Sequence, residues 1–291
     1  MGSEVATTRS APTRTVIRLR DLHLLYGRTC ALDVERLEIR AGERVFVLGH
    51  SGSGKTSLSR IIKGRTKPST GEVEVLGMSP HELERDAFRE LQRRVAMVDQ
   101  EFFLVPRLRV IDNVLHGCLG RVPSWLSLFG WYPGEEWVKA EAILAEVGLA
   151  DLGDRRVETL SGGQRQRAAI ARVLMQEAEI ILADEPVSAL DPELAEDALE
   201  LLVECVNRRD VTLLVNLHQP ELARRFASRF VGLANGRVVY DGDPSGFTEE
   251  HAQLVYRGNG NGRPQKRQQG DDASEDLAKK AGPPDIRLVR S

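Results

Sequence analysis

A glycine-rich turn between an apolar run and a helix-like run constrains the fold more than any other part of this chain. Residues 45–48 form the apolar run, which predicts a buried strand, and residues 57–62 have a helical pattern. Between them, Gly49 to Thr56 fit the spacing Gly-x-x-x-x-Gly-Lys-Thr. Glycines let the backbone approach phosphate oxygens, and the N–H groups of the loop and the helix N-terminus then face the anion. The spacing therefore predicts a phosphate-binding loop on an α/β core.

Lys55 and Thr56 are the two side chains of this loop with the clearest chemistry. The Lys55 ammonium can reach the β- and γ-phosphates of a nucleotide, and the Thr56 hydroxyl can ligate Mg²⁺. An ordinary Gly/Ser turn is the alternative, which the order of strand, turn and helix disfavours. The residues expected to bind the nucleotide here are Gly49, His50, Ser51, Gly52, Ser53, Gly54, Lys55, Thr56 and Ser57.

Composition excludes several other classes of protein. The formal net charge of −3 gives no overall attraction to nucleic acid, so no nucleic-acid partner is expected. Three cysteines without a Cys-x-x-Cys pair argue against a disulfide framework or a zinc site and fit a reducing cytosol. No run approaches the roughly 20 apolar residues of a membrane span, and the start lacks a signal-peptide pattern. A role at a membrane is therefore expected to depend on a partner.

A second apolar run, residues 180–183, ends in Asp184 and Glu185. A strand that ends in two carboxylates has the Walker B form. Asp184 is expected to hold Mg²⁺ through its water shell, and Glu185 to orient and polarise the attacking water. A solvated acidic turn is the alternative, and the phosphate-binding loop upstream disfavours it.

The segment Leu160–Gln164, Leu-Ser-Gly-Gly-Gln, precedes a helical run at 165–175. Ser161 and Gln164 have the spacing of a capping box, which alone could explain them. Capping does not need two adjacent glycines, but glycines expose N–H groups at the positive end of a helix, where a phosphate can bind. With this segment the chain resembles the ATP-binding-cassette (ABC) ATPases, whose signature is Leu-Ser-Gly-Gly-Gln.

The resemblance implies roles for further residues. Tyr26 resembles the aromatic that stacks on adenine, Gln100 the Q-loop glutamine and His218 the switch histidine that contacts the γ-phosphate. A strand-end core tyrosine and a structural histidine are the alternatives for Tyr26 and His218. The resemblance implies catalytic roles for Glu185, His218, Lys55 and Gln100, magnesium contacts from Thr56, Gln100 and Asp184, and nucleotide contacts from Tyr26, Ser161, Gly162, Gly163 and Gln164. Residues 188–191 resemble the D-loop, while Asp99 and His50 depart from the family pattern.

The predicted fold is α/β: a P-loop NTPase with a RecA-like parallel core, an antiparallel β subdomain and a helical subdomain that bears the signature. Alternating runs predict the antiparallel strands, and continuous apolar runs predict the parallel ones. Asn235-Gly236 predicts a hairpin turn. Asp191 and Pro192 predict a helix start, followed by one apolar face made of Leu194, Ala198, Leu201, Leu202 and Cys205. The predicted bounds are a mobile N-terminus at 1–13, the cassette at 14–256 with the helical subdomain at about 101–175, and a disordered tail at 257–291.

Residues 125–133 contain two of the three tryptophans of the chain. They predict either a core segment of the helical subdomain or an apolar surface patch for a partner protein. Residues 103–117, the insert up to Tyr132, and residues 215–227 resemble phosphonate-importer ATPases. Related importers of phosphite or other oxyanions share much of this pattern.

This resemblance implies the ATP-hydrolysing subunit of an importer, at the cytoplasmic face of the cell's inner membrane. The expected partners are a second copy that completes two nucleotide sites, two transmembrane permease subunits that dock on residues 101–135, and indirectly an extracytoplasmic solute-binding protein. The alternatives are an importer for another solute or a soluble ABC ATPase acting on nucleic acid or ribosomes. Soluble relatives of that kind usually carry two cassettes or a long coiled coil, and this chain shows one motif set and no sustained heptads. A non-catalytic nucleotide sensor would lack Lys55 or Glu185, and both are present.

Overall fold

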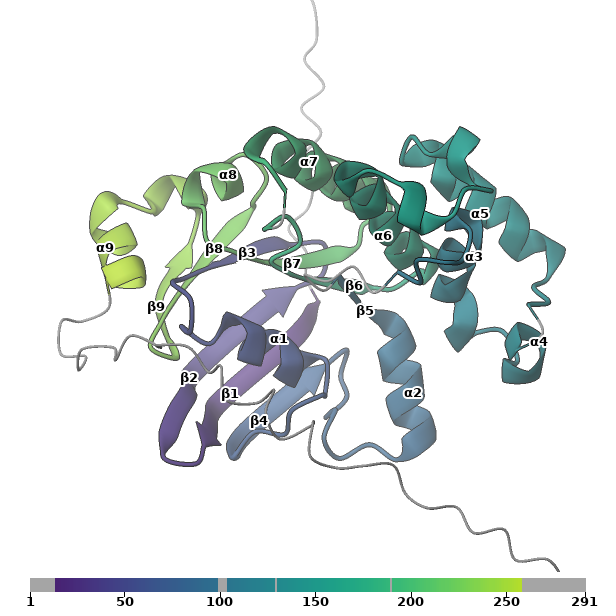
Figure 1. Ribbon diagram of the computed structural model, residues 1–291. Coiled ribbons are helices and arrows are strands. Elements are labelled where there is room, and N and C mark those ends of the chain that lie inside the picture. The colour runs from purple at the N-terminus through teal and green to yellow at the C-terminus, as the bar shows by residue number, and fades with distance from the viewer. Residues whose placement is uncertain (1–13, 99–103, 129, 189, 258–291) are drawn as a thin grey trace, which may run out of the picture. The chain divides into compact units, whose positions relative to one another are not determined.

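The computed structural model describes residues 14–98, 104–128, 130–188 and 190–257 (Figure 1). Two sheets organise it, a six-stranded sheet in the order β5-β6-β7-β3-β8-β9 and a three-stranded sheet in the order β2-β1-β4. Pairing is parallel in the larger sheet except for the hairpin β8–β9, and antiparallel in the smaller one. The strands span Thr15–Tyr26 (β1), Thr29–Arg40 (β2), Arg44–Leu48 (β3), Thr70–Val75 (β4), Val95–Val98 (β5), Ile180–Asp184 (β6), Thr212–Leu217 (β7), Arg229–Ala234 (β8) and Arg237–Gly242 (β9).

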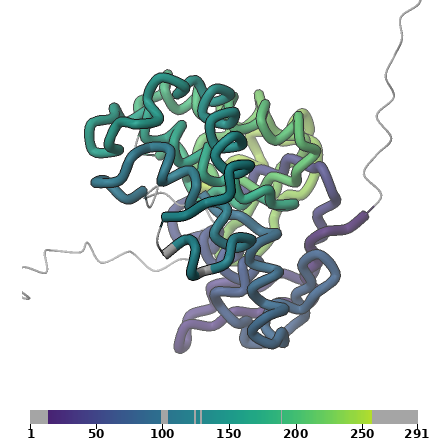
Figure 2. The backbone as a smooth tube through the Cα atoms, turned by 90° about the vertical axis from the view of Figure 1, so that its right-hand side faces the viewer, coloured from purple at the N-terminus to yellow at the C-terminus, as the bar shows by residue number. Residues whose placement is uncertain are grey.

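Helices cover the larger sheet on both faces. Figure 1 shows α6, α7 and α8 on one face, with α1 and the smaller sheet on the other. In Figure 2 the teal helices of residues 110–157 gather beside α6, away from the smaller sheet. The α-helices span Lys55–Ile62 (α1), Arg85–Arg94 (α2), Val110–Leu115 (α3), Ser124–Leu128 (α4), Gly134–Glu146 (α5), Gly162–Met175 (α6), Pro192–Arg208 (α7), Pro220–Arg224 (α8) and Glu249–Arg257 (α9), and the 3₁₀ helices span His116–Gly120 (η1), Ala150–Leu152 (η2), Val157–Thr159 (η3) and Pro244–Gly246 (η4).

The strand β3 shows why its sequence is apolar without interruption. Val45 and Val47 point into a core shared with α1 and the smaller sheet, whereas Phe46 and Leu48 point into a core shared with α6 and α7. All four side chains are fully buried. A strand covered on both faces has no solvent side for polar residues. The predicted α/β fold, with a parallel core and an antiparallel sheet beside it, is confirmed.

Local predictions are confirmed at one turn and one helix start and wrong at one position. Asn235 and Gly236 both have positive φ, as the hairpin between β8 and β9 requires, and Asp191 caps α7 through Leu194 N. The predicted apolar face of α7 is wrong at Leu194, which is 40% exposed, because its place in the first turn lies beyond the core that buries Ala198. Strand β4 ends at Val75, since the next two residues have positive φ.

Each of the two alternatives predicted for residues 125–133, a core segment and an apolar surface patch, holds for part of the segment. Trp125 and Trp131 are 61% and 65% exposed, whereas Leu126 and Tyr132 pack against the main core. None of the helices within the described ranges is long and apolar enough to cross a bilayer. The bounds of the cassette and of its helical subdomain stay predictions, and the residues 1–13, 99–103 and 258–291 lie outside the part that the structure describes.

Candidate functional site

Three parallel strands deliver the predicted site residues to one edge of the larger sheet. The phosphate-binding loop follows β3, Asp184 ends β6, and His218 follows β7. These strands are neighbours in the order β6-β7-β3 and run the same way, so their carboxyl ends meet. Residues far apart in the sequence therefore meet at the edge where open α/β sheets bind ligands.

The loop needs glycine for two different reasons. A Cβ on Gly49 would lie 2.4 Å from Ser53 Oγ and 2.5 Å from the Leu233 carbonyl oxygen, so only glycine fits there. Gly52 has open space but a φ of +79°, and Gly54, the N-cap of α1, has a φ of +109°. Glycine adopts these left-handed conformations without the steric cost that other residues bear. The loop wraps tightly and leaves the N-terminus of α1 free for an anion.

Lys55 is held across the mouth of the loop. Its Nζ donates to the carbonyl oxygens of Gly49 at 2.9 Å and His50 at 3.1 Å, and lies 3.4 Å from His218 Nδ1. Burial lowers the pKa of Lys55, and the nearby charges of Glu185 and Asp184 oppose that shift. The ammonium is preorganised by neutral carbonyl groups, which a phosphate can replace as partners.

Asp184 lies beside the first turn of α1. Its Oδ1 accepts a hydrogen bond from Thr56 Oγ1 at 3.2 Å and another from Asn216 Nδ2 at 2.7 Å. One hydroxyl and one carboxylate are too few protein ligands to complete the coordination of a metal ion. It suits Mg²⁺, which keeps several waters and binds through one or two carboxylates together with substrate phosphates. The residues present therefore fit the predicted cofactor.

Glu185 is the residue at which β6 turns away from the sheet. It has a φ of +50°, its N–H donates to the Asn216 carbonyl oxygen at 3.1 Å, and its own carbonyl oxygen accepts from Ser188. The side chain pairs with His218 Nε2, and His218 Nδ1 lies 3.0 Å from the Gly49 carbonyl oxygen. A left-handed glutamate costs about 1–3 kcal/mol, so the surrounding bonds hold the carboxylate against strain. The carboxylate is aimed back toward the phosphate-binding loop.

The signature begins α6 with the predicted capping box. Ser161 Oγ accepts from Gln164 N at 3.3 Å, and Gln164 Oε1 accepts from Ser161 N at 3.0 Å. Gly162 and Gly163 form the first turn, and a Cβ on Gly163 would lie 3.4 Å from the Leu194 side chain of α7. The side chains of Ser161 and Gln164 thus serve their own helix, and Ser161 is exposed to solvent.

The structure describes only some of the remaining predicted residues. Tyr26 ends β1 with half of its surface exposed, so it does not belong to the strand-end core. Gln100 and Asp99 lie outside the described residues, as does Ala189 of the D-loop-like segment. Ser188 and Leu190 line a pocket of about 250 Å³ together with Glu185 and His218.

Sequence reasoning missed two features of the molecule. One is Asn216, whose signal was present as a lone polar residue inside the apolar run of β7. The other is a groove of about 710 Å³ between α2, η1 and the end of α6, lined by Arg89, Arg93, His116, Leu119 and Arg121 among others. Its charged residues are paired to acids outside the groove, which no sequence pattern could show.

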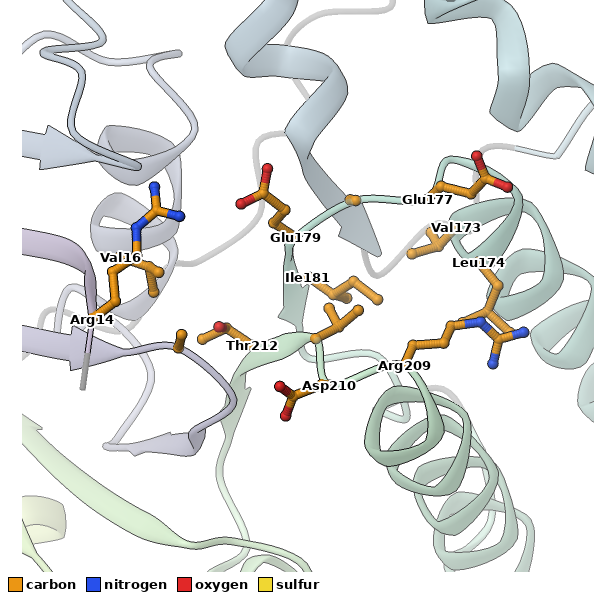
Figure 3. A pocket seen from close by; sticks show the side chains of 13 residues that line it. Arg14, Val16, Val173, Leu174, Glu177, Glu179, Ile181, Arg209, Asp210 and Thr212 are labelled. Carbon is orange, nitrogen blue, oxygen red and sulfur yellow. The ribbon is translucent and has the colours of Figure 1, made fainter. Parts of the chain in front are cut away.

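A different pocket, of about 470 Å³, lies at the opposite edge of the larger sheet (Figure 3). Its apolar base includes Val173, Ile181 and Val211, and its charged rim mixes Glu177, Glu179 and Asp210 with two arginines. Glu179 is paired with Arg94, and Arg209 with Glu146. Burial raises the pKa of the Cys118 thiol to about 11 and that of the Cys205 thiol to about 12, so both thiols stay protonated near neutral pH.

The fold and the carboxyl-edge cluster define a P-loop nucleotide hydrolase with a glycine-containing signature helix. Residues 32–188 match the family model described as ABC transporter. The chain belongs to the ABC transporter family, as one of its nucleotide-binding ATPase cassettes.

Relatives of known name cover nearly the whole cassette. The chain is 44% identical to Phosphonates import ATP-binding protein PhnC 1 of Natronomonas pharaonis over 79% of its own length and 95% of that protein. It is 40% identical to the PhnC protein of Escherichia coli over 84% of its length and 95% of that protein. Among solved structures it is similar to cbiO1 of Clostridium perfringens, with a TM-score of 0.71, 26% identity, and coverage of 82% and 92%. It is also similar to the dimeric cassette MJ0796 bound to ADP and Pi, with a TM-score of 0.66, 33% identity, and coverage of 79% and 100%.

Proposed function

We propose that this chain is the ATP-hydrolysing subunit of an importer for phosphonates or a related oxyanion such as phosphite. The observation that carries the hydrolytic part is the cluster of Lys55, Asp184 and Glu185 at one sheet edge. The substrate class is supported by the phosphonate-import relatives, which the chain matches over 79% and 84% of its length.

In the proposed reaction Lys55, Thr56, Asp184, Glu185 and His218 act through the contacts described above, and Tyr26 and Gln100 take the roles that the family resemblance implies. Lys55 leaves its two carbonyl partners and neutralises the β- and γ-phosphates, while Tyr26 stacks on the adenine. Thr56 and Asp184 hold Mg²⁺, with Gln100 as a third contact, and the bound ion supplies positive charge to the phosphate oxygens. Glu185 orients a water and accepts a proton from it as the water oxygen attacks the γ-phosphorus. The bond between the γ-phosphorus and the ADP oxygen then breaks. His218, paired with Glu185 and next to the loop, contacts the γ-phosphate.

A second copy of the chain is the proposed partner at the nucleotide. Ser161 is exposed and the N-terminus of α6 is open, with its side chains engaged only in their own capping box. A helix N-terminus favours negative charge, so it can hold the γ-phosphate bound by the loop of the other copy. The solved structure of MJ0796, a dimeric cassette bound to ADP and Pi, supports a dimer as the working form.

The groove between α2 and η1 is the proposed docking site for the cytoplasmic helices of two permease subunits. Its charged lining residues among those described are the three arginines Arg89, Arg93 and Arg121, beside the half-exposed Leu119. Trp125, two residues after the groove-lining Pro123, is exposed, and so is Trp131. Such a surface suits a partner helix that packs apolar side chains on Leu119 and brings its carbonyl end near the arginines, which keep their acidic partners. Through it the chain is held at the cytoplasmic face of the inner membrane, with the solute-binding protein acting on the far side.

Glu185→Gln tests the hydrolytic role. The glutamine keeps the size and can still orient a water, but it cannot accept the proton, and removing a general base costs about 10²- to 10⁴-fold in rate. ATP binding and ATP-dependent dimerisation should remain in the complex, measured by light scattering with and without Mg²⁺. Glu249→Gln, an exposed glutamate on α9, is the matched control and should hydrolyse normally. Normal turnover in Glu185→Gln would contradict the proposed mechanism.

The substrate is tested on the assembled importer. The tagged chain is purified from its native membranes with its permease partners, and the complex is reconstituted in vesicles with the solute-binding protein. Methylphosphonate should stimulate hydrolysis, with phosphite as the closest competitor and sulfate as the control. Stimulation by an unrelated solute alone would overturn the substrate class and leave the ATPase assignment intact.

A further inference from the structure

Asn216 has a polar side chain at a buried position where an apolar side chain would pack better. It lies on β7, in the sequence Thr-Leu-Leu-Val-Asn-Leu, and is fully buried. Its Oδ1 has no hydrogen-bond partner among the described residues. A buried and unpaired amide oxygen costs about 1–3 kcal/mol, which a leucine or valine at this position would avoid. The side chain therefore has a use other than packing the core.

The amide group of Asn216 joins the metal carboxylate to the helix of the phosphate-binding loop. Asn216 is opposite Asp184 in the parallel register of β6 and β7. Its Nδ2 donates to Asp184 Oδ1 at 2.7 Å and to Ser59 Oγ of α1 at 3.0 Å. Its backbone carbonyl oxygen, not the side-chain Oδ1, accepts from the N–H of Glu185. One residue thus bonds to both acidic residues of the site and to the helix beneath the nucleotide.

These bonds decide which oxygen of Asp184 remains available. Oδ1 accepts from both Asn216 Nδ2 and Thr56 Oγ1, so two donors fix the plane of the carboxylate. Oδ2 is then the oxygen left for the water shell of a cation. Outer partners that orient a ligating carboxylate typically change metal affinity by about 10- to 100-fold.

We propose that Asn216 is a positioning residue that orients Asp184 for Mg²⁺ in the nucleotide site. This inference rests on the proposed function, since it assigns to Asp184 the metal contact of the ATPase reaction. Asn216 touches neither nucleotide nor water in this role, and it acts through the carboxylate that it holds.

The direct test measures metal affinity without turnover. Mn²⁺ is titrated into the full chain loaded with ADP, and bound ion is followed by electron paramagnetic resonance. Asn216→Leu, which fills the site without a donor, should bind Mn²⁺ about 10- to 100-fold more weakly than the wild type. Binding of a fluorescent adenine nucleotide in EDTA should be unchanged, since Lys55 and the loop are intact. Asn216→Ala, which cannot overpack the core, should show the same loss and guards against a folding defect in the leucine variant.

Thr212→Val is the matched control. Thr212 lies at the other end of the same strand, is equally buried, and its Oγ1 accepts from Gly42 N at 3.0 Å. Losing that bond should lower the melting temperature and leave Mn²⁺ affinity at the wild-type value. Wild-type Mn²⁺ affinity in both Asn216 variants, or an equal loss in Thr212→Val, would overturn the positioning role. A wild-type chain that binds no Mn²⁺ with ADP would instead refute the proposed function itself.

Discussion

Among the bidentate ion pairs of the described residues, the pair between Arg121 and Glu136 is the most buried, so removing one of its partners should cost the most stability. Arg121 Nε and Nη2 donate to the two carboxylate oxygens of Glu136 at 2.8 and 2.7 Å, a bidentate arrangement. The two side chains are only 16% and 5% exposed. Arg121 Nη1 also donates to the carbonyl oxygens of Met175 and Gln176, where α6 ends. The pair therefore joins η1, α5 and α6.

The expected loss of folding free energy differs between the variants of the two partners. Removing one partner of a buried pair costs about 3–5 kcal/mol, because the other charge is left buried and uncompensated. Glu136→Leu should lie near 3 kcal/mol, since Arg121 keeps two carbonyl partners and a contact at 3.5 Å to Glu177. Arg121→Leu should lie near 5 kcal/mol, because it leaves both the carboxylate and the two helix carbonyls without a partner. The double variant should recover part of this and stay about 1–3 kcal/mol below the wild type, the cost of the unpaired carbonyls.

Urea denaturation of the four proteins measures these differences. At about 2–4 °C per kcal/mol, the single variants should also melt about 6–20 °C lower. The hydrogen bond from Arg121 lowers the pKa of Glu136 below its ordinary 4.5. The stabilisation is thus complete above about pH 4.5 and is lost as the pH falls through the lowered value. Single variants that lose less than about 1 kcal/mol at pH 7, or a gap between wild type and Glu136→Leu that widens in acid, would refute the reasoning.

Three further predictions concern the phosphate-binding loop and the tail. Lys55→Ala should abolish hydrolysis and weaken ATP binding, because the loop amides cannot replace the charge, and near-normal turnover would remove the loop from the mechanism. Gly49→Ala should destabilise the fold by about 1–3 kcal/mol in thermal melts, while Gly134→Ala, where a Cβ meets open space, should be neutral or stabilising. Deletion of residues 259–291 should leave hydrolysis and the melting temperature almost unchanged, since this composition has few large apolar residues, and a large drop in melting temperature would argue that it docks.

The sequence predicted those parts of the site that depend on local pattern. The spacing from Gly49 to Thr56 requires a strand, a turn and a helix in that order, and parallel strands then bring Asp184, Glu185 and His218 to the same edge. The capping box of Ser161 is likewise local and was predicted from four residues.

What the sequence could not supply is the partner of each side chain across the fold. The contact between Asn216 and Asp184 depends on the register between β6 and β7, which lie 32 positions apart in the chain. The exposure of Leu194 depends on where the core ends below α7, although the helical spacing that predicted its burial is correct. Trp125 and Leu126 are adjacent in the chain, yet only Leu126 meets the core. A sequence pattern shows which face of a helix or strand is apolar. The packing of the rest of the chain decides which residues of that face are buried.

The register of β7 is where the stability of the fold and the geometry of the site depend on the same contacts. Leu213 and Val215 point into one core and Leu214 into the other, and they pair with Ile181, Ala183 and Leu182 of β6. A slip by one residue would preserve the backbone hydrogen bonds but turn each apolar side chain to the opposite core, and it would bring Val215 or Leu217 opposite Asp184. Because both faces of the sheet are packed, that slip would disrupt side-chain packing in both cores. The core thus selects the one register in which an amide reaches the carboxylate, without any contribution from the bound nucleotide.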